Sequence, residues 1–192
     1  MQSTAYHEGL PGHHLQGSIA LESTTLPTFR SIAMERDDLP LFRNIEWHSA
    51  YGEGWALYAE LLAKEMGAFL DPYSDFGRLA NEIWRAVRLV VDTGIHAKGW
   101  SEQQTVDYIL ANTASPLATV RSEVERYFVA PGQALSYKMG MIKILDLRAE
   151  SKKVLGDQFD IRNFHDLVVG GGSVPLPLLE RAVHSWLGKQ EN

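Results

Sequence analysis

The chain of 192 residues contains no cysteine. This absence excludes disulfide bonds, thiolate nucleophiles and cysteine-ligated zinc sites, so any metal ion has to be held by histidine, aspartate or glutamate. The formal net charge is −6 and no cluster of lysine and arginine stands out, whereas a nucleic-acid or anionic-membrane surface would need such a cluster. We therefore expect small molecules, peptides or other proteins as partners, and no nucleic acid.

Long apolar runs are also missing. None approaches the roughly 20 residues of a membrane-spanning helix, and the N-terminus lacks the basic and then apolar segments of a signal peptide. We expect no membrane span, and a cytoplasmic location by default, or an exported one if the parent protein has a signal. The 45% hydrophobic and 22% charged residues are typical of a globular protein, and the length predicts one domain, residues 1–192.

Apolar residues recur at helical spacing along most of the chain and predict an all-α fold. Glycine and proline mark most of the breaks between helices, and serine is placed to cap two of them. Residues 17–40 have the least regular pattern and leave room for a small β-hairpin. The predicted helices cover residues 42–67, 76–97, 101–113, 116–129, 133–155, 163–168 and 175–188.

The stretch YHEGLPGHHLQ, residues 6–16, places three histidines and a glutamate around a Pro-Gly pair. Metallopeptidases often hold zinc with two histidines at i and i+4 of one helix, beside a glutamate that activates water. His7 and His13 are six residues apart, which on a regular helix separates them by about 240°. His7 and His14 share a face but lie about 10 Å apart along the axis. Neither pair can share one ion on a regular helix.

Pro11 breaks this regularity, because it has no N–H to donate to the carbonyl of His7 and its ring clashes with that carbonyl. Gly12 follows and can adopt backbone angles closed to other residues. A helix that expels two residues as a bulge at residues 10–12 would bring His13 to the place of the usual i+4 ligand, and such bulges occur at functional sites. The alternative is a Pro-Gly loop whose histidines lie at the surface.

A third candidate ligand stands on the helix predicted for residues 42–67. Glu53 begins the stretch EGWALYAE, and a carboxylate from a second helix would complete a set of two histidines and one glutamate with an open position for water. Glu60 lies seven residues later on the same face, where it is placed to hold a ligand histidine. The alternative is that both are solvated charges, although Trp55 and Leu57 make a fully exposed face less convincing.

The stretches HEGLPGHHLQ (residues 7–16) and EGWALYAE (residues 53–60) resemble the DUF885 family of bacterial proteins, whose pattern is HExxPGHxxQ followed by EGWxxYxE. Three later stretches are also similar to that family: VDTGIHAKGWSEQQ, PGQALSYKMG and FHDLVVGGGSVPLPLLE. The resemblance spans nearly all of the chain. Five motifs in the same order make it specific.

DUF885 in turn resembles the gluzincin metallopeptidases, in which HExxH and a downstream glutamate hold zinc. By that resemblance His7, His13 and Glu53 bind one Zn²⁺ and Glu8 is the general base. The histidines of this chain are two residues further apart than in HExxH, so His14 remains the alternative to His13. The implied fold is part of an all-α, multi-helix, gluzincin-like catalytic domain, the C-terminal third of a DUF885 protein. A preceding N-terminal domain or a homo-oligomer would then complete the cleft.

A polar stripe lies on the helix predicted for residues 76–97, at Asn81, Arg85, Arg88, Asp92 and His96. Such a stripe is usually a water-facing surface with ion pairs between successive turns. In the competing interpretation it lines the metal site, where Asp92 orients a ligand histidine and His96 contacts the substrate. We assign the same supporting role to Gln16, the last residue of the first motif, and to Glu60.

Gln133 and Tyr137 lie one turn apart at the start of the helix predicted for residues 133–155. A tyrosine hydroxyl is a suitable donor to the oxyanion that forms when hydroxide attacks a carbonyl, and Tyr137 is our first candidate for that donor. Gln133, Arg126 and Lys138 are candidates for substrate binding. The alternatives are a core aromatic ring for Tyr137 and plain surface charges for the two cations.

The sequence therefore predicts a zinc-dependent hydrolase of the peptidase type, which cleaves a peptide or small amide with a metal-activated water and a glutamate base. One alternative is a helical metal-binding or scaffold module, inactive or truncated, without turnover. Another is an iron oxygenase with two histidines and one carboxylate, although an oxygenase needs no glutamate base beside its ligand. The identity of the metal and a hydrolysis assay would discriminate between them.

Overall fold

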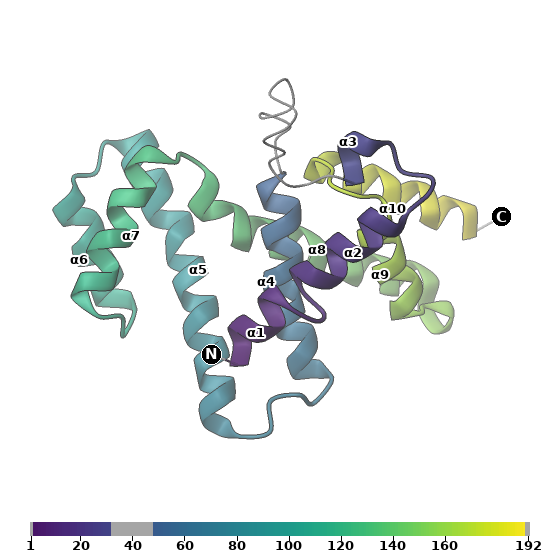
Figure 1. Cartoon of the computed structure of the whole chain (residues 1–192), viewed down its shortest axis with the longest axis horizontal. Helices are drawn as coiled ribbons and strands as arrows, with labels where there is room; N and C mark the ends of the chain where they lie inside the picture. Colours follow the sequence, from purple (N-terminus) through teal and green to yellow (C-terminus); the bar gives the residue numbers. More distant parts are fainter. Residues whose placement is uncertain (1, 32–47, 191–192) are drawn as a thin grey trace.

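The computed structural model describes residues 2–31 and 48–190, and this part of the chain forms helices and connecting turns with no strand. The prediction of an all-α fold is confirmed for these residues. In Figure 1 the short α1 and α2 lie along α4, and α6 and α7 lie side by side at the opposite end from α9 and α10. The elements are α1 (Gln2–Glu8), α2 (His13–Glu22), α3 (Thr28–Ser31), α4 (Ser49–Glu65), α5 (Pro72–Lys98), α6 (Glu102–Asn112), α7 (Leu117–Val129), α8 (Gln133–Leu155), the 3₁₀ turn η2 (Gly156–Gln158), α9 (Ile161–Gly170) and α10 (Leu176–Gln190).

Side-chain caps explain where α5 and α6 begin. The Asp71 carboxylate accepts hydrogen bonds from the backbone N–H groups of Tyr73 and Ser74, so α5 begins directly after Asp71, earlier than predicted. Ser101 and Gln104 form a reciprocal capping box at the start of α6. These contacts satisfy N–H groups that the first turn of a helix leaves without a partner.

The end of α8 also follows a local signal. α8 covers the predicted residues 133–155 and stops at Gly156, whose φ of 53° favours glycine. α4 begins at Ser49, and residues 42–47 of the predicted helix lie outside the described residues.

The β-hairpin predicted near residues 17–40 is wrong for residues 17–31, because α2 continues to Glu22 and α3 follows. Ala20 is buried and Ile19 packs against the main hydrophobic cluster. Packing of this face of α2 therefore stabilises a helix that its irregular pattern of apolar residues did not reveal. Residues 32–40 of the predicted hairpin lie outside the described residues.

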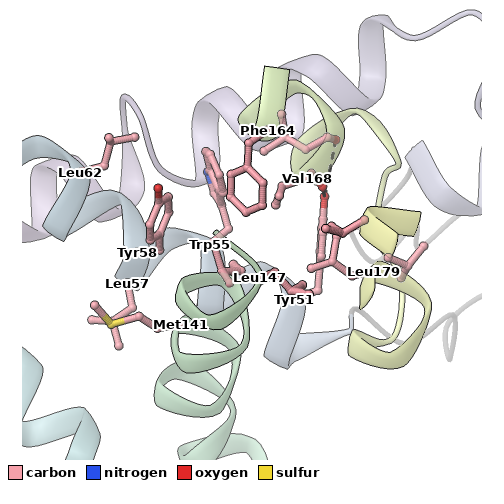
Figure 2. Packing of buried hydrophobic residues seen from close by; sticks show 14 of the residues in the cluster. Tyr51, Trp55, Leu57, Tyr58, Leu62, Met141, Leu147, Phe164, Val168 and Leu179 are labelled. Atoms are coloured by element: carbon pink, nitrogen blue, oxygen red, sulfur yellow. Dashed lines mark hydrogen bonds between the residues drawn. The ribbon is translucent and has the colours of Figure 1, made fainter. Parts of the chain in front are cut away.

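The main hydrophobic cluster surrounds α4. Figure 2 shows Tyr51, Trp55 and Tyr58 of α4 gathered with Phe164 and Val168 of α9, and all five side chains are at most 2% exposed. The hydroxyl group of Tyr51 donates to the carbonyl oxygen of Val168 at 2.9 Å. Burial of each such large side chain stabilises the fold by about 1.5–3 kcal/mol. This packing fixes the helix that bears Glu53 and Glu60.

A second hydrophobic cluster joins α5 to α6 and α7, with Val91, Ile109 and Val124 at most 1% exposed. Ala134, at the start of α8, belongs to this cluster, whereas Met141 and later residues of α8 belong to the main one. α8 therefore connects the two packed regions.

α4 and α8 come into close contact at Gly54 and Gly140. A Cβ atom on Gly54 would lie 2.5 Å from the Cα atom of Gly140, and a Cβ atom on Gly140 would lie 1.8 Å from the carbonyl oxygen of Ala50. Both distances are far below van der Waals contact, so this crossing requires glycine at both positions. The crossing brings Tyr137, one turn before Gly140 on α8, near Glu53.

Candidate metal centre

A tight turn joins α1 to α2 where the sequence predicts a bulge within one helix. The bulge is wrong in form, because α1 ends and α2 begins as a separate helix. A Cβ atom on Gly12 would lie 1.8 Å from the carbonyl oxygen of His7, so this close approach of the backbone requires glycine. The indole N–H of Trp55 donates to the carbonyl oxygen of Pro11 at 2.9 Å and ties the turn to α4.

The turn directs two histidines at one carboxylate oxygen. The Nε2 atom of His7 lies 3.3 Å from Oε2 of Glu53, and the Nε2 atom of His13 lies 3.2 Å from the same oxygen. The two imidazole rings are nearly perpendicular, with centroids 4.9 Å apart. Among the described residues, these three side chains form a group whose ligand atoms all lie within 4.8 Å of one another. His14 is exposed, and the structure brings His13 rather than His14 to Glu53.

The spacing of these atoms suits a small divalent cation. Zinc binds imidazole nitrogen and carboxylate oxygen at about 2.0–2.2 Å in tetrahedral geometry, which separates neighbouring ligand atoms by about 3.3 Å. The nitrogen-to-oxygen distances of 3.3 and 3.2 Å match that separation. Two imidazoles and one carboxylate leave a fourth position for water or substrate. The donor set and its two nitrogen-to-oxygen distances therefore fit one zinc ion, with all three ligand atoms within 4.8 Å of one another.

Glu60 contacts the other ring nitrogen of His7. Its Oε1 atom lies 2.9 Å from Nδ1 of His7, and its Oε2 atom accepts a hydrogen bond from the hydroxyl group of Ser3. The Glu60 side chain is almost fully buried, where a carboxylate without partners would be costly. This contact fixes the ring of His7 with Nε2 directed at Glu53.

Burial and hydrogen bonding have opposite effects on the pKa values of His7 and Glu53. Burial by itself would lower the pKa of His7, but the hydrogen bonds to Glu53 and Glu60 outweigh it and raise the pKa to about 9. Burial by itself would raise the pKa of Glu53, but the hydrogen bonds to His13 and His7 lower it to about 2. The metal-free group is therefore a paired set of an imidazolium and carboxylates, in which a divalent cation would take the place of protons.

Tyr137 reaches the same group from α8. Its ring stacks on the ring of His7, with centroids 6.1 Å apart and an angle of 23° between the planes. Burial raises the pKa of its hydroxyl group, and the negative charge of Glu53 acts in the same direction. The Nε2 atom of Gln133 donates to that hydroxyl group at 3.3 Å. Tyr137 therefore stays protonated at neutral pH, and a hydrogen bond to Glu53 is one of the causes of its raised pKa.

Glu8 is the last residue of α1 and directly follows His7. Its side chain is exposed. With the described residues it forms no hydrogen bond or ion pair. Its carboxylate is thus not committed to a structural contact within the described part of the chain.

A comparison with protein families gives one match over residues 1–183, to DUF885, described as bacterial protein of unknown function. The chain belongs to the DUF885 family. This confirms the resemblance drawn from the motifs. No curated protein matches the chain.

Two solved structures are similar to this DUF885 chain. One, a putative lipoprotein from Colwellia psychrerythraea, has a TM-score of 0.87 and 46% sequence identity over 98% of this chain. The other, a putative lipoprotein of unknown function from Shewanella oneidensis, has a TM-score of 0.78 and 26% identity over 94% of this chain. In each case the match covers 30% of the longer protein. Within the described residues, no helix has both the length and the apolar composition needed to cross a membrane.

The structure does not bring Asp92 to His7, whose two ring nitrogens face Glu60 and Glu53. The backbone N–H of Gly132 lies 3.2 Å from each carboxylate oxygen of Asp92, just before α8 begins. Asp92 therefore anchors the start of the helix that bears Tyr137, and its role in orienting a ligand histidine stays a prediction.

The observed neighbours of His96 and Gln16 are Tyr127 and Tyr51, respectively. The Nε2 atom of His96 donates to the carbonyl oxygen of Tyr127 at 2.9 Å, at the end of α7. His96 stands about 16 Å further along α5 than Arg85, which contacts Tyr137, so the structure does not place it beside the metal ligands. Gln16 is buried and lines a small cavity with Tyr51.

The predicted substrate-binding residues are engaged with neighbours. Arg126 donates to Oε1 of Gln133 at 2.6 Å and to Oε2 of Glu123 at 2.9 Å. Lys138 pairs with Glu82 at 2.5 Å. Their role in substrate binding stays a prediction, although Gln133 alone of the three contacts Tyr137.

Sequence reasoning missed Ser3 and left Arg85 and Arg88 undecided. Ser3 precedes the motif, and no local pattern announces its contact with Glu60. The two arginines belong to the polar stripe, yet Arg88 is only 7% exposed. Arg88 directly follows Val87, and Val91 lies three residues after Arg88. Because both valines are buried in the second cluster, this spacing indicates that the face of α5 that bears Arg88 is partly covered.

Proposed function

We propose that this domain binds one zinc ion through His7, His13 and Glu53 and hydrolyses a peptide or small amide, with Glu8 as the general base. The main support is the convergence of two Nε2 atoms on one carboxylate oxygen, at 3.3 and 3.2 Å. Two histidines, one carboxylate and an open position are the ligand set of catalytic zinc sites, whereas structural sites use four protein ligands.

Glu60 and Glu53 prepare the two histidines for this task. Because a carboxylate oxygen of Glu60 lies 2.9 Å from Nδ1 of His7, that nitrogen keeps its proton when a cation displaces the proton of Nε2, and Nε2 then presents its lone pair. The negative charge of Glu53 lies between the two Nε2 atoms and favours a cation there.

Zinc, when bound, lowers the pKa of its water toward about 7 and polarises the scissile carbonyl. Glu8 accepts the proton of the attacking water and passes it to the leaving amine, first as a base and then as an acid. Its exposed position next to His7 supports this role. Glu53 and Glu60 are unsuited to it because both are already bonded to histidine.

Tyr137 is the donor to the oxyanion of the tetrahedral intermediate. Its ring lies against His7, and its raised pKa keeps the hydroxyl group protonated. A fixed donor in a partly buried site stabilises developing negative charge more than water does.

Zinc analysis and a hydrolysis assay test this function together. The chain is stripped with a chelator, reloaded with zinc, analysed for bound metal and assayed with a library of fluorogenic peptides. We expect one zinc per chain and hydrolysis that the chelator abolishes. No bound zinc, or equal hydrolysis in excess chelator, would contradict the proposal.

A metal-binding module without turnover is the second candidate. It is favoured by the coverage of the similar structures, since the chain spans 30% of the length of each and their other residues could complete a cleft. Stoichiometric zinc with no cleavage of any library peptide is the result that it predicts.

A further inference from the structure

Two arginines of α5 lie next to the proposed metal centre. The guanidinium carbon of Arg88 is 4.9 Å from the ring centroid of Tyr137, and that of Arg85 is 5.7 Å from the same centroid. The ring of Tyr137 in turn stacks on His7. The two cations and a proposed zinc ligand therefore contact the same aromatic ring.

Each arginine has a buried nitrogen that forms no hydrogen bond with the described residues, namely Nε of Arg85 and Nη1 of Arg88. Arg88 is 7% exposed, and its other nitrogens donate to the hydroxyl group of Tyr127 and to Glu123, both at 2.8 Å. Arg85 donates only a long 3.4 Å bond to the carbonyl oxygen of Asn81. Buried N–H groups are nearly always hydrogen-bonded, so these two donors lack the acceptor that a buried N–H group normally has.

The arginines here also have few carboxylate partners of their own. Glu123 is shared, because Arg88 pairs with it at 2.8 Å and Arg126 at 2.9 Å. Glu60 and Glu53 attract Arg85 electrostatically, but their hydrogen bonds are with other residues, namely Ser3, His7 and His13. Burial lowers the pKa of Arg85, and the charge of Arg88 acts in the same direction. An anion between the two guanidinium groups would relieve this repulsion.

Arg78, on the same helix, is a buried arginine whose charge is paired with two carboxylates. It is also 7% exposed, but it pairs with Asp75 at 2.9 Å and with Glu82 at 3.0 Å. Buried nitrogens without a hydrogen bond are thus a property of Arg85 and Arg88 rather than of α5 as a whole.

We propose that Arg85 and Arg88 bind a carboxylate of the substrate, one or two residues from the scissile bond. This inference rests on the proposed function for the position of that bond. Guanidinium groups match the planar geometry of a carboxylate and can bind it through paired hydrogen bonds.

The Tyr137 ring lies 6.1 Å from the His7 ring and 4.9 Å from the Arg88 guanidinium carbon. One or two extended residues of about 3.5 Å each, with a contact at each end, span the distance from the His7 ring to the Arg88 guanidinium group. The substrates are then short peptides with a free C-terminal carboxylate, or peptides with an acidic side chain beside the cleaved bond.

A binding experiment tests the carboxylate site independently of catalysis. Succinate and the uncharged succinamide are titrated into the chelator-treated, ¹⁵N-labelled chain, and the Nε–H signals of the arginines are followed by NMR. We expect succinate to shift the signals of Arg85 and Arg88 saturably and succinamide to leave them unchanged. Equal responses to both compounds, or none to succinate, overturn the proposal whatever the result of the zinc assay.

Matched variants locate the site. Arg85→Gln should weaken succinate binding at least tenfold, and Arg85→Lys, which keeps the charge, should weaken it less. Arg78→Gln, the control on the same helix, should stay within twofold of the unchanged chain. Circular dichroism verifies that each variant is folded. A folded Arg85→Gln that binds succinate as tightly as the unchanged chain overturns the assignment.

Kinetics with the zinc-loaded chain then identify the source of the carboxylate. Three peptides of one sequence are compared: a free C-terminal acid, its amide, and the amide with aspartate beside the scissile bond. A KM at least tenfold lower for the free acid alone assigns the C-terminal carboxylate, and an equally low KM for the aspartate peptide assigns a side chain. Equal KM values for all three contradict the proposal.

Discussion

The Nδ1 atom of His7 lies 2.9 Å from Oε1 of Glu60, and both side chains are at most 4% exposed. This contact joins residues 53 positions apart in the sequence, and the hydroxyl group of Ser3 holds the second oxygen of the same carboxylate. His7 is therefore fixed before any metal arrives. A fixed ligand loses little conformational freedom when the metal binds.

The first prediction concerns this contact. Glu60→Gln keeps the size of the side chain but removes the charge that supports the Nδ1–H of His7. We expect zinc affinity to fall about 10- to 100-fold while the chain remains folded, as measured by competition with a chelating dye. Glu65→Gln, at the end of the same helix, is the control and should leave the affinity unchanged. An unaltered affinity in Glu60→Gln would show that the contact is not needed to hold the ligand.

The second prediction separates the general base from the ligands. Glu8→Gln should retain one zinc per chain and lose hydrolysis by at least 100-fold, because an amide cannot accept the proton of the water. His7→Ala or Glu53→Ala should lose the metal itself. Metal analysis and peptide cleavage on the same samples give both quantities. If Glu8→Gln kept full activity, the base would have to be another residue.

The third prediction concerns the contact between α4 and α8. Gly140→Ala places a Cβ atom 1.8 Å from the carbonyl oxygen of Ala50, so the helices must separate. We expect a loss of about 1–3 kcal/mol or more in the free energy of unfolding, the typical cost of overpacking, and weaker zinc binding. Gly77→Ala, in open space on α5, should instead stabilise the chain by about 0.5–1 kcal/mol. Urea denaturation compares the two, and equal effects would contradict the role given to the crossing.

The fourth prediction is a dependence of stability on pH at His165. Its Nε2 atom accepts a hydrogen bond from the hydroxyl group of Tyr58 at 2.8 Å. Burial lowers the pKa of His165, and the nearby charge of Arg148 lowers it further. Below about pH 6.5 the unfolded chain binds a proton that folded His165 resists, so the free energy of unfolding falls as the pH falls.

His165→Gln should reduce this loss of stability. We expect the difference in unfolding free energy between pH 7.5 and 5.5, measured in urea with chelator present, to be smaller in the variant. The change is bounded by about 1.4 kcal/mol per pH unit. His184→Gln, at an exposed histidine of α10, is the control. An identical pH dependence in His165→Gln and in the unchanged chain would contradict the effect of burial on His165.

Much of the helical framework could be predicted because its signals are local. Asp71 and Ser101 cap helices through contacts with residues two or three positions away, and Gly156 stops α8 through its own backbone angle. Such signals depend on a few neighbouring residues and survive in the sequence alone. The hairpin prediction failed where the sequence lacked them and where packing of Ile19 and Ala20 stabilised a helix instead.

The sequence by itself determined the helices from α4 onward and the candidate ligands, together with the family to which they belong. Only the tertiary structure decided that His13 rather than His14 faces Glu53, that Asp92 anchors α8, and that Arg85 lies over Tyr137. The physical reason is the distance along the chain over which each contact acts. A cap needs only the next turn of chain, whereas the ligand group requires a glycine turn and a helix crossing to bring together residues that are 40 or more positions apart.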